Sequence, residues 1–212
     1  MNNAKIIIIG AGLSGLMMAY LLQKKGFEVI ILEAESRIGG RIETLTGSNG
    51  ATMEMGATWF SKPHQNLIAL LEGFKIPYFK QHTQGISFFE TMSFVPPQKF
   101  EISDSEESSF RIVGGTAKLI EKLVEKIGIQ NIKTDTKVTT IKEVDNYLEV
   151  TDYKGIKYTA EKVISTLPPH LLVQTIKFEP ALPESIVQLA KKTHTWMGES
   201  IKFSVEYATP FW

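Results

Sequence analysis

Three glycines near the start of the chain have the spacing of a loop that binds a phosphate group. Gly10, Gly12 and Gly15 form the pattern G-x-G-x-x-G directly after an apolar run. Gly10 permits a tight turn, Gly12 lets a phosphate approach the backbone, and Gly15 lets a helix pack closely on a strand. The unpaired N–H groups and partial positive charge at the start of the next helix would face a pyrophosphate. The pattern therefore predicts a dinucleotide site.

An acidic residue at a suitable distance supports this interpretation. Glu33 follows Gly15 by eighteen residues and ends a second apolar run. A carboxylate at this place accepts hydrogen bonds from the adenosine ribose, and its charge repels a 2′-phosphate. We therefore expect FAD or NAD rather than NADP. The alternative is a glycine-rich turn of another α/β protein that happens to be followed by an acid.

A strand, a helix and a second strand must position these residues. Residues 5–9 are a β-branched run, typical of a strand buried on both faces of a parallel sheet. A helix is predicted over 13–25 and ends at Gly26, which suits a left-handed cap. Residues 27–32 are the second strand. The uncharged stretch 6–22 is shorter than a membrane span and is interrupted by glycines, so neither a span nor a signal peptide is predicted.

The residues after this second strand resemble a signature of known flavoproteins. The stretch 33–41, E-A-E-S-R-I-G-G-R, is similar to the E-x-x-x-R-x-G-G-R pattern of the flavin-containing amine oxidase superfamily. That group includes monoamine, polyamine and L-amino-acid oxidases and, more distantly, protoporphyrinogen oxidases and carotenoid desaturases. The resemblance implies FAD as the cofactor, with Arg41 beside it as a fork of donors. Without the resemblance, Arg41 would be interpreted as a solvated surface arginine.

Two further segments resemble the same superfamily. Residues 56–59 resemble the segment that runs beside the flavin, and Val138 matches a valine whose backbone pairs with the adenine edge. Without the resemblance, 56–59 would be an ordinary turn with a core tryptophan. The residues expected to bind FAD are Gly10, Gly12, Leu13, Ser14, Gly15, Glu33, Ala34, Gly40, Arg41, Gly56, Ala57, Thr58, Trp59 and Val138.

The rest of the chain alternates between short helices and strands. The predicted helices are 63–71, ended by Gly73; 116–127, with Thr116 as its N-cap; and 183–192, with Ile186, Leu189 and Ala190 facing inward. The predicted strands are the hairpin 42–45 and 51–54, the strand 85–90, an antiparallel meander of 137–143, 147–153 and 156–159, the buried strand 162–166, and the half-buried strand 199–208. Residues 103–109 are expected to be an acidic surface segment and 177–183 a linker.

These elements predict an α/β fold with two domains. We expect a Rossmann-like FAD-binding domain, formed by a parallel sheet plus an antiparallel β-meander, from residues 1–79 and 111–175. A partial α+β substrate domain is expected from residues 80–110 and 176–212. In the family, a catalytic lysine near flavin N5 and an aromatic cage lie further along the pattern. We expect both beyond Trp212, so the chain is interpreted as a fragment and no catalytic residue is assigned.

Composition excludes several classes of function. The chain has 23 basic and 23 acidic residues, which argues against nucleic acid or an anionic membrane as the main partner. It has no cysteine, so disulfides and thiolate metal sites are excluded, and a cytoplasmic location is expected. The four histidines lack the spacing of metal ligands, and no metal site is predicted.

The resemblance implies a reaction as well as a cofactor. We expect an FAD-dependent oxidoreductase that oxidatively deaminates a small-molecule amine, by hydride transfer to the flavin, and passes the electrons to O2 with production of peroxide. One alternative is an oxidase or desaturase of isoprenoid or porphyrin substrates from the same superfamily. Another is a non-catalytic dinucleotide-binding protein, like the Rab GDP-dissociation inhibitors. The identity of the amine and the oligomeric state stay open.

Overall fold

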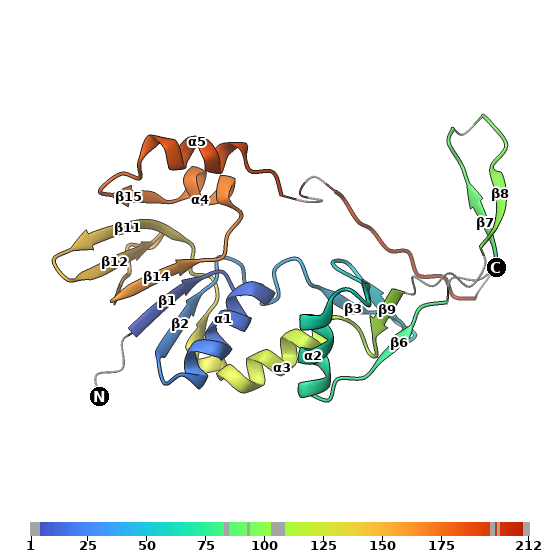
Figure 1. Ribbon diagram of the computed structural model, residues 1–212, viewed down its shortest axis with the longest axis horizontal. Coiled ribbons are helices and arrows are strands. Elements are labelled where there is room, and N and C mark those ends of the chain that lie inside the picture. Colours follow the sequence, from blue (N-terminus) through green and yellow to red (C-terminus); the bar gives the residue numbers. More distant parts are fainter. Residues whose placement is uncertain are drawn as a thin grey trace.

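A parallel sheet forms the centre of one end of the molecule (Figure 1). The computed structural model describes residues 5–82, 85–92, 94–102, 109–195, 198 and 200–209 of the 212-residue chain. The predicted acidic segment 103–109 lies almost entirely outside these residues. The strands of the central sheet, in spatial order, are β10 (Ile132–Lys133), β2 (Glu28–Leu32), β1 (Lys5–Ile9) and β14 (Lys162–Ser165). All neighbouring pairs in it are parallel, which confirms the three predicted strands.

The strand order of this sheet changes direction at β1. From β1 the chain moves to β2 and then to β10 on one side, whereas β14 lies on the other side. Such a change of direction leaves a crevice at the carboxyl ends of the two strands that flank it. The first strand is fully apolar after Lys5, and Ile6 to Ile9 are all buried, as expected for a strand covered on both faces.

Two helices cover one face of the sheet. They are α1 (Leu13–Lys24) and α3 (Ala117–Ile127), which contact each other along their lengths. Leu16, Leu119 and Leu123 are buried in this layer. The predicted cap of α1 is confirmed: Gly26 has a φ of 86°, its N–H donates to the Gln23 carbonyl at 2.9 Å, and the following N–H donates to the Leu22 carbonyl at 3.1 Å.

An antiparallel meander covers the other face. Its strands are β11 (Val138–Val144), β12 (Tyr147–Asp152) and β13 (Lys157–Ala160), which confirms the predicted meander. Ile7, Ile9, Leu32 and Val150 form the core between meander and sheet. The predicted linker over 177–183 is partly wrong, because β15 (Lys177–Glu179) extends the meander by pairing parallel with β11.

Two short helices follow the last strand of the central sheet. They are α4 (Pro169–Thr175), which was not predicted, and α5 (Glu184–Lys192), which was. The predicted inward face of α5 is wrong in part. Ala190 is buried, but Ile186 is half exposed and Leu189 is 65% exposed. The apolar spacing predicted that these residues share a face of the helix, but the described residues leave most of that face uncovered.

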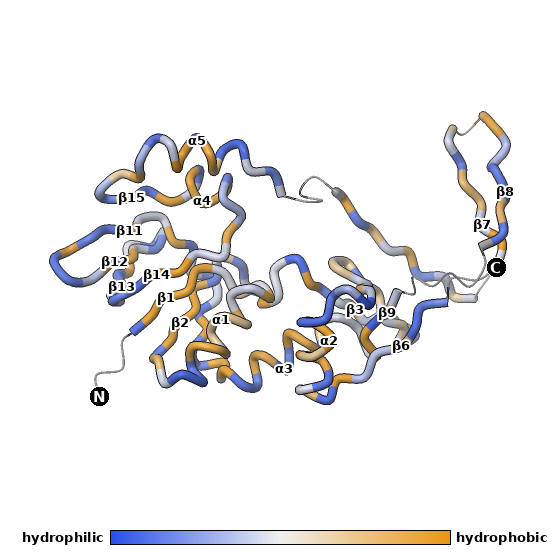
Figure 2. The backbone as a smooth tube through the Cα atoms, viewed as in Figure 1, coloured by the Kyte–Doolittle hydropathy of each residue, from blue (hydrophilic) through white to orange (hydrophobic). Residues whose placement is uncertain are grey.

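The remaining strands form small sheets at the other end of the molecule (Figure 1). They are the predicted hairpin of β3 (Thr44–Thr46) and β4 (Thr52–Glu54); the sheet of β5 (Phe60–Ser61), β9 (Ser109–Ile112) and β6 (Tyr78–Lys80); and the hairpin of β7 (Gly85–Phe89) and β8 (Gln98–Ile102). A single 3-10 turn, η1 (Ile129–Asn131), precedes β10. Figure 2 shows hydrophobic stretches along the buried strand β1 and also along the projecting β7–β8 hairpin.

The helix α2 (Gln65–Gly73) ends differently from the prediction. Gly73 is the last helical residue, and the left-handed position falls two residues later, on Lys75 with a φ of 57°. The N–H of Lys75 donates to the Glu72 carbonyl at 3.0 Å and that of Ile76 to the Leu71 carbonyl at 2.8 Å. In this hydrogen-bond pattern the left-handed position is usually a glycine. The prediction therefore placed the end of the helix at Gly73, two residues before the residue that has the left-handed conformation.

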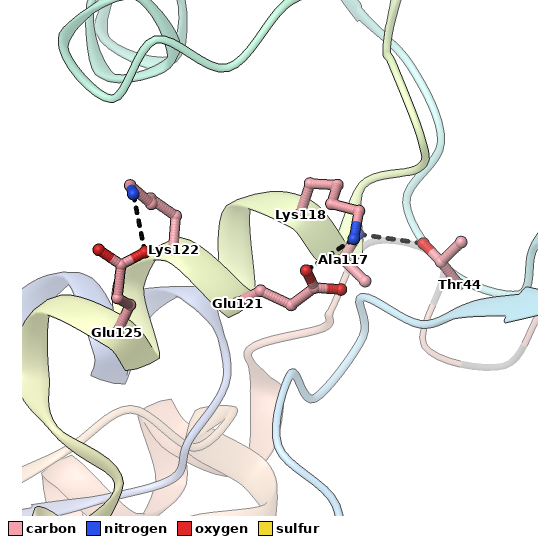
Figure 3. A network of polar contacts seen from close by, with 6 residues as sticks. All are labelled: Thr44, Ala117, Lys118, Glu121, Lys122 and Glu125. Atoms are coloured by element: carbon pink, nitrogen blue, oxygen red, sulfur yellow. Dashed lines mark hydrogen bonds and ion pairs between the residues drawn. The ribbon is translucent and has the colours of Figure 1, made fainter.

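The predicted N-cap of α3 is also wrong. Thr116 has helical φ and ψ angles and makes no capping bond with its own side chain. Its N–H instead donates to Glu54 Oε1 at 2.6 Å, and the N–H of Ala117 donates to Thr44 Oγ1 at 3.0 Å. Figure 3 shows the Thr44–Ala117 bond beside the surface ion pairs of α3. Side chains of the β3–β4 hairpin therefore cap this helix.

The described part of the predicted strand 199–208 forms no β-strand. Residues 200–207 are exposed throughout, and Ile201 is 91% exposed. The segment is held by side-chain contacts: Glu206 accepts hydrogen bonds from Ser48 and Asn49, and Lys202 contacts Gly56 and Thr58. The predicted burial of one face is wrong for these residues.

Candidate functional site

The glycine loop lies at the carboxyl edge of β1, next to the place where the sheet order changes direction. Gly10 has a φ of 103°, which glycine adopts without strain, and its N–H donates to the Leu32 carbonyl at 2.9 Å. A Cβ atom on Gly15 would overlap the Gly10 carbonyl oxygen. These two glycines therefore have the predicted roles in the tight turn and in close packing of helix and strand.

Gly12 differs from its two neighbours because the protein itself does not require a glycine there. Its backbone is extended, with a φ of −73° and a ψ of 176°, which any residue can adopt. A Cβ atom would approach only Gly40 Cα, at 3.9 Å, an ordinary contact distance. The bare backbone at Gly12 fits a ligand that must come close to it, as a pyrophosphate does.

The first turn of α1 presents backbone donors beside this loop. The first hydrogen bond of the helix runs from the Leu16 N–H to the Gly12 carbonyl at 3.0 Å. The N–H groups of Leu13, Ser14 and Gly15 belong to the turn that has no preceding helical carbonyl to bind. They lie at the positive end of the helix, which favours an anionic group.

Glu33 is turned toward the glycine loop and not toward bulk water. Its side chain follows β2 and is buried, with the residue 9% exposed. Oε2 accepts a hydrogen bond from the Ala11 N–H at 2.6 Å, and Oε1 accepts one from the Glu35 N–H at 3.0 Å. Each carboxylate oxygen can accept a further hydrogen bond. The carboxylate therefore stabilises the loop while keeping acceptor capacity for ribose hydroxyls.

The second glycine pair packs directly on the loop. Gly39 donates its N–H to the Ala11 carbonyl at 2.9 Å, and Gly12 and Gly39 form a parallel bridge. A Cβ atom on Gly40 would come within 3.1 Å of Gly12 Cα. Ala34 is exposed at the same edge of the sheet. The structure thus brings Gly40 to Gly12, as predicted for two segments that share one ligand.

Arg37 holds this turn, a role that the sequence analysis did not assign. Its guanidinium donates to the Gly40 carbonyl at 2.8 Å and to the Ile42 carbonyl at 3.4 Å. It also lies 3.6 Å from a Glu43 carboxylate oxygen. Arg41, the arginine that was predicted to lie beside the cofactor, is exposed. The signature itself contained the signal for Arg37, because it specifies an arginine at this position.

The segment predicted to face the flavin lies against the same turn. The Arg41 carbonyl accepts the Ala57 N–H at 3.1 Å, and a Cβ atom on Gly56 would overlap that carbonyl oxygen. Thr58 Oγ1 donates to the Gly56 carbonyl at 3.0 Å. Trp59 is 65% exposed and so is no core tryptophan. The alternative of a turn that buries a core tryptophan is therefore wrong.

Val138 lies in the core between the meander and the central sheet, near the end of β2 that leads into Glu33. It begins β11, is buried, and packs in the core under the meander with Ile9 and Leu32. Two residues earlier, the Thr136 N–H donates to the Glu33 carbonyl at 2.8 Å. The structure therefore brings the start of β11 to the end of β2, where the prediction places the adenine.

Lys202 is the second residue that the sequence analysis did not place. Its ammonium donates to Thr58 Oγ1 at 2.6 Å and to the Gly56 carbonyl at 3.0 Å. A lysine beside the flavin segment was expected only beyond Trp212, and the chain position of Lys202 gave no signal for this contact.

Among the residues that the structure describes, no group of three or more histidine, aspartate or glutamate side chains is placed to hold a metal ion. None of the helices in the described ranges is long and apolar enough to cross a membrane.

Comparison with known families agrees with the geometry of the loop. A family model described as "Flavin containing amine oxidoreductase" matches residues 13–91 and 78–212. The chain belongs to this family. The two matches overlap over residues 78–91, which include β6 and β7.

Relatives of the chain within the family include two amine oxidases. Putrescine oxidase of Kocuria rosea is 34% identical over 84 residues, which cover 40% of this chain and 17% of that protein. Amine oxidase [flavin-containing] B of Bos taurus is 23% identical over 308 residues, which cover all of this chain and 58% of that protein. The alignment with the bovine enzyme is longer than this chain, so the bovine enzyme has residues at aligned positions where this chain has gaps.

Solved structures of the family share the fold. Cyclohexylamine oxidase from Brevibacterium oxydans superposes with a TM-score of 0.77 at 18% identity, over 89% of this chain and 63% of that one. Putrescine oxidase bound to putrescine superposes with a TM-score of 0.75 at 19% identity and the same coverage. At this identity the likeness shows the α/β fold alone. The chain spans less than two thirds of the length of each of these relatives.

Proposed function

We propose that this chain is the FAD-binding part of an amine-oxidising flavoenzyme. The observation that carries the proposal is the buried Glu33 carboxylate turned toward the Gly10–Gly12 loop, at the change of direction of a parallel sheet. Membership of a flavin-containing family supports FAD over NAD as the dinucleotide. Most of the predicted cofactor-binding residues fall on three neighbouring segments, the glycine loop, the turn at residues 39–41 and residues 56–59, whereas Glu33 and Ala34 follow β2 and Val138 begins β11.

The residues of this chain bind and orient the cofactor in this proposal. The backbone of Gly12 and the first turn of α1 would hold the pyrophosphate, Glu33 would accept the ribose hydroxyls, and the backbone of Val138 would pair with the adenine edge. Arg41 and residues 56–59 face the flavin. Bound FAD supplies the redox chemistry, by taking a hydride equivalent from the carbon next to the amine nitrogen and passing the electrons to O2 as peroxide.

The amine class of the substrate is supported by the relatives. Putrescine oxidase and cyclohexylamine oxidase are named for amine substrates. Within this proposal, Lys202 is a candidate for the lysine beside the flavin, because its ammonium contacts Gly56 and Thr58. The proposed division into domains is 1–79 with 111–175 for FAD, and 80–110 with 176–212 for the substrate.

The experiment that tests the proposal is a binding titration on the purified full chain. We expect a yellow protein, or a colourless one that becomes yellow when it takes up FAD, with tighter binding of FAD than of NAD and weakest binding of NADP. A colourless protein that ignores added FAD would favour the non-catalytic, inhibitor-like alternative.

Activity is tested separately from binding. The loaded protein is mixed with a panel of primary amines, and peroxide release is measured. Lys202→Met is expected to slow reduction of the bound flavin without changing the FAD affinity, because the ammonium contacts the flavin segment and not the glycine loop. Equal reduction rates for the wild type and this variant would remove Lys202 from the site.

A further inference from the structure

Thr166 lies directly beneath the glycine loop and has no role in the function described so far. It follows β14, on the strand that flanks the change of direction of the sheet. Its backbone N–H donates to the Ile9 carbonyl at 3.0 Å, and its hydroxyl donates to the same carbonyl at 2.9 Å. The hydroxyl oxygen is also 3.4 Å from the Gly10 carbonyl oxygen. One side chain therefore fixes the two peptide units that lead into the loop.

The hydroxyl also occupies the space that the two structural glycines leave free. A Cβ atom on Gly10 would lie 2.7 Å from Thr166 Oγ1, and one on Gly15 would lie 3.2 Å from it. The threonine thus packs between the turn and α1, in contact distance of both. Thr166 therefore contacts the loop at Gly10 and Gly15. At Gly12 the packing of the protein does not require a glycine, and we expect the ligand to approach the loop there.

We propose that Thr166 is a positioning residue for the pyrophosphate of the dinucleotide. Its hydroxyl holds the Ile9 and Gly10 carbonyl groups, while the N–H groups of the same two peptide units donate to the Leu32 carbonyl and to Glu33. These contacts fix the start of the loop, and so set the position of Gly12 and of the N–H groups in the first turn of α1 that would face the phosphate. The inference rests on the proposed FAD site. It goes further because it assigns phosphate recognition to a side chain from the last strand of the sheet, more than 150 residues from the loop.

Substitution of the hydroxyl alone tests the proposal. Thr166→Val keeps the branched shape and removes the donor, and Thr166→Ser keeps the donor. We expect Thr166→Val to raise the Kd for FAD about five- to tenfold, the scale of one hydrogen bond. Thr166→Ser is expected to stay within about twofold of the wild type. The matched control is Thr139→Val, which removes a hydroxyl that donates to the Thr151 carbonyl at 3.2 Å in the meander, and no change in Kd is expected.

A second measurement separates positioning of phosphate from a general structural effect. ADP and adenosine are titrated against each variant. We expect Thr166→Val to weaken ADP as much as FAD and to weaken adenosine less, because adenosine has no phosphate to place and depends on Glu33 alone. Equal weakening of ADP and adenosine would overturn the proposal, and so would unchanged binding of FAD by Thr166→Val.

The outcomes also distinguish this proposal from the proposed function. If the wild type binds no FAD, the flavoenzyme proposal fails and Thr166 falls with it. If the wild type binds FAD and Thr166→Val binds it equally well, only the role of Thr166 fails. If Thr166→Val does not fold by circular dichroism, Thr166→Ala removes the same hydroxyl with less bulk and carries the same expectation.

Discussion

Two of the buried carboxylates, Glu33 and Glu54, bind backbone N–H groups in different parts of the molecule. Glu33 is 9% exposed and Glu54 is 6% exposed. Glu33 accepts the N–H groups of Ala11 and Glu35, at the edge of the parallel sheet. Glu54 accepts the N–H of Thr116 and the hydroxyl of Thr44, where the β3–β4 hairpin meets α3. The two carboxylates have almost the same chemistry, and their surroundings differ.

The difference lies in what remains open around each carboxylate. A Cβ atom on Gly115 would come within 3.0 Å of Glu54 Oε1, so this carboxylate is enclosed by the protein that it holds together. Glu33 is followed by the exposed residues Ala34 and Glu35 and binds the N–H of Ala11, the residue next to Gly12. We infer that Glu54 serves folding, whereas Glu33 serves both the loop and a ligand.

The largest effect is expected from removing the enclosed carboxylate. Glu54→Ala leaves the N–H of Thr116 and the hydroxyl of Thr44 without their acceptor, so we expect a loss of about 2–4 kcal/mol in the free energy of unfolding. Urea denaturation followed by circular dichroism measures it. Glu121→Ala on α3 is the control, because its exposed ion pair with Lys118 (Figure 3) is expected to contribute less than about 1 kcal/mol. Equal losses for the two variants would contradict the capping role.

The second prediction concerns ligand affinity. Glu33→Ala is expected to cost on the order of 1–3 kcal/mol of FAD affinity, because the ribose loses a buried acceptor. The free energy of unfolding should fall less than in Glu54→Ala, since water reaches the Glu35 N–H at the open edge of the sheet. Isothermal titration with FAD measures the affinity, and Glu35→Ala is the neighbouring control. If folded Glu54→Ala loses as much FAD affinity as Glu33→Ala, the inference that only Glu33 serves a ligand is wrong.

The part of the fold around Glu33 could be predicted from the sequence because its signals are local. The apolar run of β1, the glycine pattern and the cap at Gly26 lie within about one strand–helix unit of each other. Each signal needs only its own neighbours in the chain, and the structure places all three as expected.

The junction around Glu54 could not be predicted in the same way. The bond from Thr116 to Glu54 joins residues 62 positions apart. A local reading of the sequence therefore assigned the cap to Thr116 itself. The strand predicted at 199–208 failed for a related reason, because alternation predicts which residues share a face but not whether a neighbouring strand is present. Lys202 was missed with it.

An exposed carboxylate with the same kind of partners gives the smallest expected effect. Hydrogen bonds from the Ser48 N–H, the Asn49 N–H and the Ser48 hydroxyl lower the pKa of Glu206 below its ordinary value. Because its pKa is lower in the folded chain than in the unfolded chain, the ionised group stabilises this contact above the unfolded pKa. That stabilisation is lost as the pH falls through the lowered folded pKa.

The contact of Glu206 joins its part of the chain to the β3–β4 turn, so acid is expected to release Glu206 from the turn while the Lys202 contacts with Gly56 and Thr58 and the central sheet stay in place. The amide NMR shifts of Ser48 and Asn49, followed as the pH is lowered, measure the release. In Glu206→Gln the amide does not ionise, so the same shifts should not titrate. Glu179→Gln is the control, because Glu179 also has a lowered pKa, through Lys177, but lies on β15 away from the turn. If the Ser48 shifts titrate unchanged in Glu206→Gln, a group other than Glu206 causes the titration. The proposed comparison of the exposed Glu206 with the buried Glu33 and Glu54 would then fail.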